Sequence, residues 1–163
     1  MRDGLITRVL FWKYIYPLVK MAGIKIIGAS HAGRLARELA GEGALKSEST
    51  ERYFAEFLLG GRRCRVTHEY KTGEIFVWFE EKAAVSVLKR ILGLTQYLGK
   101  ALVVGILPGR ELPKEAFIEV PGGRIGITHA GEGLWIGWDG TNWLFSATVQ
   151  GIAELIEILE AGR

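Results

Sequence analysis

Two runs of β-forming residues on either side of Lys71-Thr72-Gly73 constrain the fold of this chain more than any other feature. They lie within RCRVTHEYKTGEIFVWF, residues 63–79. A three-residue connection that ends in a left-handed glycine joins two antiparallel strands. In that register His68 faces Phe76 across the hairpin. One face of the hairpin is then expected to carry Cys64, Val66, His68, Tyr70, Phe76 and Trp78, and the other to carry Arg63, Arg65, Thr67, Glu69, Ile75, Val77 and Phe79.

Periodicity, capping residues and turn residues predict the other elements. Before the hairpin we expect a helix at residues 5–19, a strand at 24–27, a helix at 30–40 and a third helix from Ser47 or Ser49 to residue 59. After it we expect a helix at 82–98, strands at 117–120, 124–128, 134–138 and 143–146, and a final helix capped by Thr148.

These elements predict one compact α+β domain over residues 1–163. It has N-terminal helices, a β-hairpin followed by a helix, and an antiparallel β-meander closed by a C-terminal helix. Two lobes are possible within it. Residues 1–60 would be helical, with the element order of a winged helix-turn-helix, and residues 61–163 would be rich in strands. The predicted third helix is acidic, which disfavours its docking on DNA phosphates.

The composition indicates a cellular setting. Cys64 is the single cysteine, so no disulfide forms within the chain and a cytoplasmic location is expected. Few side-chain amides combined with abundant Glu, Lys and Arg are typical of thermophilic, archaeal-like proteins. The apolar N-terminal stretch carries four basic residues, which disfavours a membrane span. We expect this stretch to pack on the domain or on a second copy, as in a homodimer.

Charge is distributed unevenly along the chain. The net charge is +3 overall, but residues 1–46 and 82–114 each carry +5, whereas residues 47–81 carry −2 and residues 115–163 carry −5. The basic stripe of the helix at 82–98 has no acidic residue beside it. Such an asymmetry produces a positive field instead of a salt-bridged surface, and a basic field attracts nucleic acid.

Basic and aromatic residues together define the predicted site. We expect nucleic acid, DNA or RNA, to bind through single-stranded or structure-selective contacts, without sequence reading, because aromatic residues on a sheet stack bases and basic residues hold phosphates. The candidate residues are Arg62, Arg63, Arg65, His68, Tyr70, Lys71, Phe76, Trp78, Lys82, Lys89, Arg90, Tyr97 and Lys100.

Two other functions stay open. The chain could be a non-catalytic assembly subunit of a larger complex, with the N-terminal helix and the Trp135–Trp143 hairpin as interfaces. It could instead be a small enzyme that holds a phosphorylated ligand at the turn from Gly28 to Arg34, although that turn lacks the hydroxyl of a P-loop. We expect no catalytic residue, cofactor or metal, since no complete catalytic motif and no metal-ligand spacing is present.

One stretch resembles a known family. YFAEFLLGGRRCRV, residues 53–66, with the hairpin and helix that follow, is similar to a LAGLIDADG homing-endonuclease half-domain over roughly residues 50–98. The metal-binding acid that ends that family's helix is absent here, where Leu59, Gly60 and Gly61 stand. The resemblance therefore implies a binder that does not cleave.

Overall fold

The computed structural model describes residues 22–108, 117–120, 123–126, 133–138 and 142–161. Its strands form one antiparallel sheet of ten strands in the order β2-β3-β4-β5-β1-β6-β10-β9-β8-β7. Helices and an antiparallel sheet together confirm the α+β class. The predicted helix at residues 5–19 lies outside the described residues.

The elements follow one another along the chain as two similar series. The first is β1 (Gly23–Ile27), α2 (Ala32–Ala40), β2 (Leu45–Glu48), β3 (Arg52–Leu59), β4 (Arg62–Glu69), β5 (Ile75–Phe79), a short 3-10 turn (Glu81–Ala83), α3 (Ala84–Gly93) and α4 (Thr95–Leu98). The second is β6 (Leu102–Pro108), β7 (Phe117–Val120), β8 (Gly123–Gly126), β9 (Leu134–Trp138), β10 (Asn142–Ala147) and α5 (Val149–Ala161).

The two series share one internal plan. In each, the first strand lies at the centre of the sheet, the second lies at the outer edge, and the next three return step by step to the centre. A helix then follows the last strand, α3 in the first half and α5 in the second. The halves meet where β1 pairs with β6 over residues 23–27 and 102–106. The structure thus contains an internal repeat.

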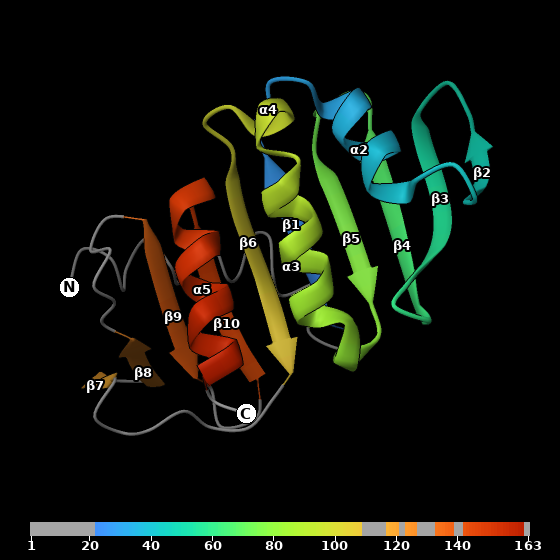
Figure 1. Cartoon of the computed structure of the whole chain (residues 1–163). Coiled ribbons are helices and arrows are strands. Elements are labelled where there is room, and N and C mark those ends of the chain that lie inside the picture. Colours follow the sequence, from blue (N-terminus) through green and yellow to red (C-terminus); the bar gives the residue numbers. More distant parts are fainter. Residues whose placement is uncertain (1–21, 109–116, 121–122, 127–132, 139–141, 162–163) are drawn as a thin grey trace.

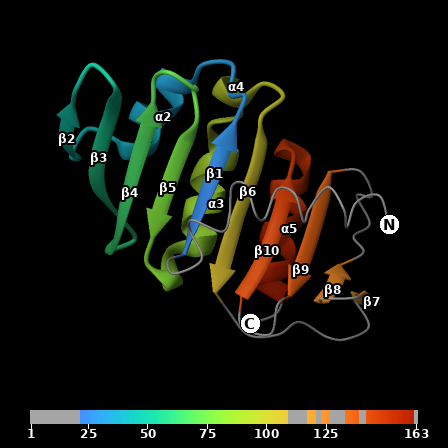
Figure 2. The same cartoon turned by 180° about the vertical axis from the view of Figure 1, so that it is seen from behind.

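All four described helices cover one face of the sheet, here called the helix face (Figure 1). Seen from behind, the sheet stands in front of the helices (Figure 2). α2 contacts β3 and β4, while α5 contacts β6, β9, β10 and α3. The core lies between these two layers, and burial of each large apolar side chain there stabilises the fold by ~1.5–3 kcal/mol. Its largest fully buried members include Ile24, Leu35, Phe79, Leu88 and Phe145.

The predicted third helix is wrong, because residues 45–59 form the hairpin β2–β3. Buried Tyr53, Ala55 and Phe57 alternate with exposed Arg52, Glu56 and Leu58, which is the period of a strand. The amides of Glu51 and Arg52 each donate to the Ser49 hydroxyl at 3.2 Å. Ser49 therefore closes a turn with the bonds that it would have made as a helix cap. The winged-helix element order and the LAGLIDADG resemblance both require a helix in this segment, so both expectations are wrong.

The hairpin β4–β5 is confirmed, but its predicted register is wrong by one residue. His68 pairs with Ile75 and Val66 pairs with Val77. Four residues, not three, form the connection, since the Glu69 amide donates to the Glu74 carbonyl at 3.0 Å. A one-residue slip moves a whole strand's side chains to the other face. Cys64, Val66 and His68 therefore share the helix face with Ile75, Val77 and Phe79, while Phe76 and Trp78 lie on the opposite face with Arg65 and Thr67.

The later elements match their predictions closely. The strands β7 and β9 have the predicted bounds, β10 is one residue longer than predicted at each end, and α5 begins directly after its predicted cap, Thr148. Strand β8 begins one residue earlier than predicted, and the last two positions of that prediction, 127–128, lie outside the described residues. The helix expected over residues 82–98 is divided at Leu94 into α3 and α4. None of the described helices has the length and apolar character needed to cross a bilayer.

Candidate nucleic-acid interface

The opposite face of the sheet carries aromatic side chains over its first-half strands. Phe54 on β3 and Phe76 and Trp78 on β5 are partly exposed there, and Arg65 on β4 is exposed. These four residues are here called the aromatic platform. The strand pairing places the side chains of this face in two rows that cross β3, β4 and β5. In one row Thr67 lies between Phe54 and Phe76, and in the other Arg65 lies between Glu56 and Trp78. Nearer the centre, Val104 and Ile106 on the same face are buried. Among the described side chains, the accessible aromatic surface of this face therefore lies over β3 to β5.

Cations already lie over the two rings of β5. The guanidinium carbon of Arg65 is 4.7 Å from the Trp78 ring centroid. The ammonium nitrogen of Lys25, on β1, is 4.8 Å from the Phe76 ring centroid. Lys25 is only 5% exposed, so its side chain helps to hold Phe76 in place and its charge is largely inaccessible to a binding partner. Arg65 is the cation of the platform that solvent reaches.

Carboxylates accompany these cations, which the sequence did not indicate. Arg65 Nε is 3.4 Å from Glu56 Oε1, and Lys25 Nζ is 2.7 Å from Glu74 Oε2. At the rim, Arg52 Nε is 2.7 Å from Glu69 Oε1. The platform is thus a mosaic of ion pairs and not a uniform basic field. The more exposed pairs, Arg65–Glu56 and Arg52–Glu69, contribute only ~0–1 kcal/mol each, so a phosphate can compete for them.

Arg63 lies at the end of this face with a carboxylate partner of its own. Glu80 accepts a hydrogen bond from the Arg63 amide at 2.7 Å, and its second oxygen is 3.5 Å from Arg63 Nε. The backbone hydrogen bond, followed by the guanidinium, lowers the pKa of Glu80 below its usual range. The Arg63 side chain is 71% exposed, so most of its donors face solvent.

The basic helix is not part of this surface. α3 lies on the helix face, where its Val87, Leu88 and Ile91 are buried in the core. Its cations have structural partners. Lys89 forms an ion pair with Glu160 of α5, and Arg90 donates to the carbonyl oxygens of Leu39 and Glu38 at 3.0 and 2.8 Å. Arg90 therefore closes the C-terminal end of α2.

The other predicted residues are spread over the molecule. Arg62 and Lys71 are exposed at opposite ends of β4, and Lys82 and Lys100 are exposed at the two ends of the α3–α4 segment. The Tyr97 carbonyl accepts hydrogen bonds from the His31 amide at 3.1 Å and from the Ser30 hydroxyl at 3.4 Å. In the turn from Gly28 to Arg34, where a phosphorylated ligand was considered, the His31 amide is thus already hydrogen-bonded to a carbonyl group of the protein. Sequence spacing alone could not show this contact.

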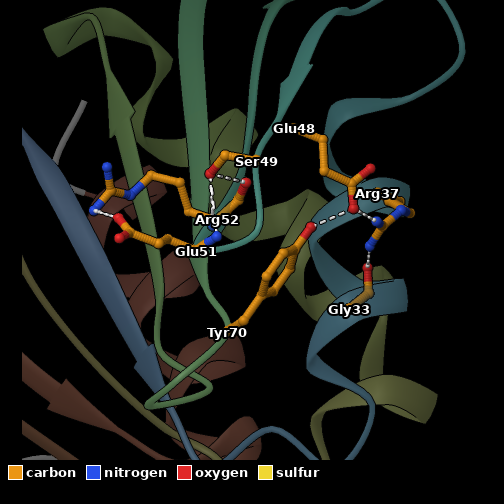
Figure 3. Close-up of polar contacts among 7 residues, drawn as sticks. All are labelled: Gly33, Arg37, Glu48, Ser49, Glu51, Arg52 and Tyr70. Atoms are coloured by element: carbon orange, nitrogen blue, oxygen red, sulfur yellow. Dashed lines mark hydrogen bonds and ion pairs between the residues drawn. The ribbon is translucent and has the colours of Figure 1, made fainter.

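His68 and Tyr70 lie in a polar cluster beneath α2, on the helix face. Figure 3 shows Tyr70 and Arg37 meeting at Glu48: the Tyr70 hydroxyl donates to Glu48 Oε1, and Arg37 Nη2 donates to the same oxygen at 3.1 Å. The Arg37 guanidinium lies 4.6 Å from the Tyr53 ring centroid. Sequence reasoning missed the roles of Arg37, Glu48 and Tyr53, because they join only when the chain folds into β2–β3.

Two buried polar atoms of this cluster have no hydrogen-bond partner among the residues that the structure describes. They are His68 Nδ1 and the Tyr53 hydroxyl, and their residues face each other across β3 and β4. Burial, followed by the charge of Arg37, lowers the pKa of His68 below its usual value near 6.5, although Glu69 acts in the other direction. The imidazole is therefore neutral in the folded protein at neutral pH.

We expect the protein to lose stability as the pH falls below about 6.5. A depressed His68 pKa means that the unfolded chain binds the proton first, so the contribution is fully present above pH ~6.5 and is lost below it. The slope is at most about 1.4 kcal/mol per pH unit. Urea unfolding at several pH values measures it. His68→Gln should flatten the curve over this range, and an equally steep curve in the variant would assign the loss to other groups.

Metal and thiol chemistry receive no support from side-chain placement. Within the described ranges, no three His, Cys, Asp or Glu side chains lie together as ligands for a metal ion. Cys64 is buried, and burial, followed by the charge of Glu80, raises the pKa of its thiol to about 11. The thiol is therefore protonated at neutral pH, a form that neither attacks electrophiles nor binds metals well.

Comparison with known proteins does not assign this chain to a family. No protein-family model matches the chain, and no curated protein matches it. The similarity to a LAGLIDADG half-domain over residues 50–98 thus has no support from a family match, and β3 replaces the helix on which it depended. The chain is therefore described by its fold, a ten-stranded antiparallel α+β protein built from two similar halves.

Proposed function

We propose that the protein binds nucleic acid, with single strands preferred, through the aromatic platform on the opposite face of the sheet. The observation that carries this proposal is the row of partly exposed aromatic rings next to an exposed guanidinium, Trp78 beside Arg65. Sheets that bind single strands stack bases on such rings and hold the backbone with nearby cations.

Magnitudes favour the exchange that binding requires. An exposed cation–π contact such as Arg65 over Trp78 contributes ~0.5–1 kcal/mol, whereas stacking of a base contributes ~1–3 kcal/mol. A base can therefore displace the guanidinium from the ring. Arg65 would then turn to a phosphate, for which its planar group is well shaped. Arg63, with its exposed side chain, would hold a neighbouring phosphate.

The basic helix has a different role in this proposal from the one that its sequence suggested. Lys89 and Arg90 join α3 to α5 and to α2, on the far side of the sheet from the rings. A strand that stacks on the platform would meet Arg63 and Arg65 first. We therefore assign phosphate contact to the hairpin arginines and a structural role to Arg90.

Binding is tested by fluorescence anisotropy with labelled single- and double-stranded DNA and RNA at several salt concentrations. Each phosphate contact with a single strand adds about 0.7 to the slope of log K against log salt. Arg63→Ala with Arg65→Ala should therefore lower the affinity for every sequence and flatten the slope by about 1.4 units.

The matched control removes two charges from the helix face. Lys82 and Lys100 are exposed and lie on the segment that carries α3 and α4. Changing both to Ala alters the net charge as much as the arginine pair does, but should leave the slope nearly unchanged. Equal effects of the two double variants would show non-specific attraction to a basic protein. Absence of binding to all four nucleic acids at low salt would overturn the proposal.

A second function, that of a non-catalytic assembly subunit, is favoured by one observation. Leu45 and Leu58 are 75% and 69% exposed, on neighbouring strands at the outer edge of the first half. Large apolar side chains that gather on a surface mark contact sites. Light scattering of the wild-type protein and of Leu45→Ser with Leu58→Ser tests it: a mass that falls in the variant supports assembly through this edge, and a wild-type monomer excludes self-assembly.

A further inference from the structure

A cavity of about 600 Å³ lies where α2 ends, beside the closed end of the β3–β4 hairpin. Its lining comes from α2 and the loop after it, from β2, β3 and β4, and from α3. The residues that matter here are Gly41 after α2, Leu45 of β2, Leu58 of β3, Arg63 and Arg65 of β4, and Arg90 of α3. This volume is in the range of small-ligand sites, which is ~300–1,000 Å³.

The sheet edge leaves apolar surface at this cavity. β2 pairs with β3 only from Tyr53 to Glu56, so β3 continues past the end of its partner. Leu58 lies on that continuation, and Leu45 begins β2 next to it. Both side chains are mostly exposed, and each would be covered by an apolar body that entered the cavity.

The same cavity carries an excess of positive charge. Three arginines line it, against one carboxylate, that of Glu56. A guanidinium has five N–H donors. The contacts described above use one donor of Arg63, one of Arg65 and two of Arg90. Donors therefore remain for an anion, and the planar fork of arginine suits a carboxylate or a phosphate.

We propose that this cavity binds a small organic anion. Arg63 and Arg65 would hold its carboxylate or phosphate, and its aliphatic or aromatic body would cover Leu45 and Leu58. Arg90 would add positive charge from α3, while it keeps its hydrogen bonds to the carbonyl groups at the end of α2. The inference differs from nucleic-acid binding in its apolar part, because it needs Leu45 and Leu58 at the outer edge of the sheet and neither Phe76 nor Trp78, while Arg63 and Arg65 would serve both.

The experiment uses four probes with the full-length protein: hexanoate, hexyl phosphate, hexanol and inorganic phosphate. Binding is measured by titration with ¹⁵N–¹H NMR, in which amides of the lining residues should shift. We expect hexanoate or hexyl phosphate to bind at least about tenfold more tightly than either half-molecule, a difference that corresponds to ~1.4 kcal/mol. The stronger of these two probes identifies the carboxylate or the phosphate as the preferred head group.

Two variants separate the parts of the site. Leu58→Ser and Arg63→Gln change exposed side chains, and each should weaken the preferred probe by about tenfold. Lys82→Gln removes an exposed charge outside the cavity and should have no effect. Equal binding of hexanol, equal binding of inorganic phosphate, or unchanged affinity in both Leu58→Ser and Arg63→Gln would overturn the proposal. So would the absence of shifts at about 10 mM of both organic anions, which marks a Kd above about 10 mM.

The outcomes also distinguish this site from the proposed function. Trp78→Ala should weaken base stacking and leave the anion probes bound. Leu58→Ser should weaken the anion probes and leave the affinity for single strands unchanged. Substitution of Arg63 should weaken both, so the two sites are separated by Trp78→Ala and Leu58→Ser alone, and loss of both kinds of binding in each of these two variants would contradict a separate anion site.

Discussion

Replacement of Gly105 by alanine is expected to destabilise the fold strongly. Gly105 lies on the central strand β6, between β1 and β10. A methyl group there would be 2.3 Å from Ile24 Cγ2, 2.6 Å from Phe145 Cε1 and 2.8 Å from the Gly23 carbonyl oxygen. Real carbon atoms do not approach so closely, and neither the fully buried neighbours nor the backbone has space to retreat.

The expected cost is about 3 kcal/mol or more, at the upper end of what overpacking causes. It corresponds to a fall in Tm of roughly 6–12 °C for a domain of this size. Thermal unfolding followed by circular dichroism measures it. Gly93→Ala is the matched control, because Gly93 ends α3 with open space around it, and that variant should melt at or slightly above the wild-type temperature. A Gly105→Ala protein with the wild-type Tm would show that the packing around Gly105 is looser than these distances indicate.

Phe79→Ala and Trp78→Ala are expected to have opposite effects, although the two residues are neighbours in the sequence. Phe79 is 1% exposed in the core on the helix face, while Trp78 is partly exposed on the other face. Loss of a buried phenylalanine ring costs ~3–5 kcal/mol. Loss of Trp78 should leave the fold intact and weaken single-strand binding by ~1–3 kcal/mol, with the salt slope nearly unchanged, because stacking releases no counterions.

Urea unfolding and anisotropy, measured on both variants, check the pair. The comparison tests the hairpin register directly, since a one-residue slip would exchange the two results. If Trp78→Ala unfolds the protein and Phe79→Ala does not, the faces have been assigned the wrong way round. If both variants fold and bind as the wild type does, the platform has no part in stacking.

The sequence predicted the elements whose signals were local. Strands β9 and β10 follow from alternation, and α5 follows from the Thr148 cap, whose hydroxyl accepts a hydrogen bond from the Gly151 amide at 3.4 Å. The predicted turn at Asp139-Gly140 lies outside the described residues. In α2, by contrast, the Ser30 hydroxyl bonds to the Tyr97 carbonyl and makes no cap. A capping residue predicts where a helix begins better than it predicts which bond is made.

The largest error came from the ambiguity of short apolar patterns. Tyr53, Phe54, Phe57 and Leu58 fit a helical stripe and a strand equally well, and only pairing with β2 and β4 decides between them. The slip in the hairpin came from a turn of four residues where three were assumed. The strand β6 was not predicted at all, although its apolar run from Leu102 to Leu107 is typical of a strand buried on both faces.

Most of the candidate site depended on long-range pairing. The sequence identified Arg65, Phe76 and Trp78 as a basic and aromatic group, and the structure places these three together. It could not show that His68 and Tyr70 face the other way, nor that Arg90 would be occupied with the end of α2. Charge counting along a helix gives no information about which carbonyl groups will fold against it.

At the seam, where β1 pairs with β6, each half of the sheet hydrogen-bonds to a strand edge that the other half would otherwise leave unpaired. Both strands are central, and each pairs on one side within its own half and on the other side across the seam. A chain cut between α4 and β6 would expose a full-length, largely apolar strand edge on each piece, which is the kind of edge that recruits other chains. The fold thus links the solubility of one half to the folding of the other, and a nascent first half must wait for Leu102–Pro108 before its central edge is closed.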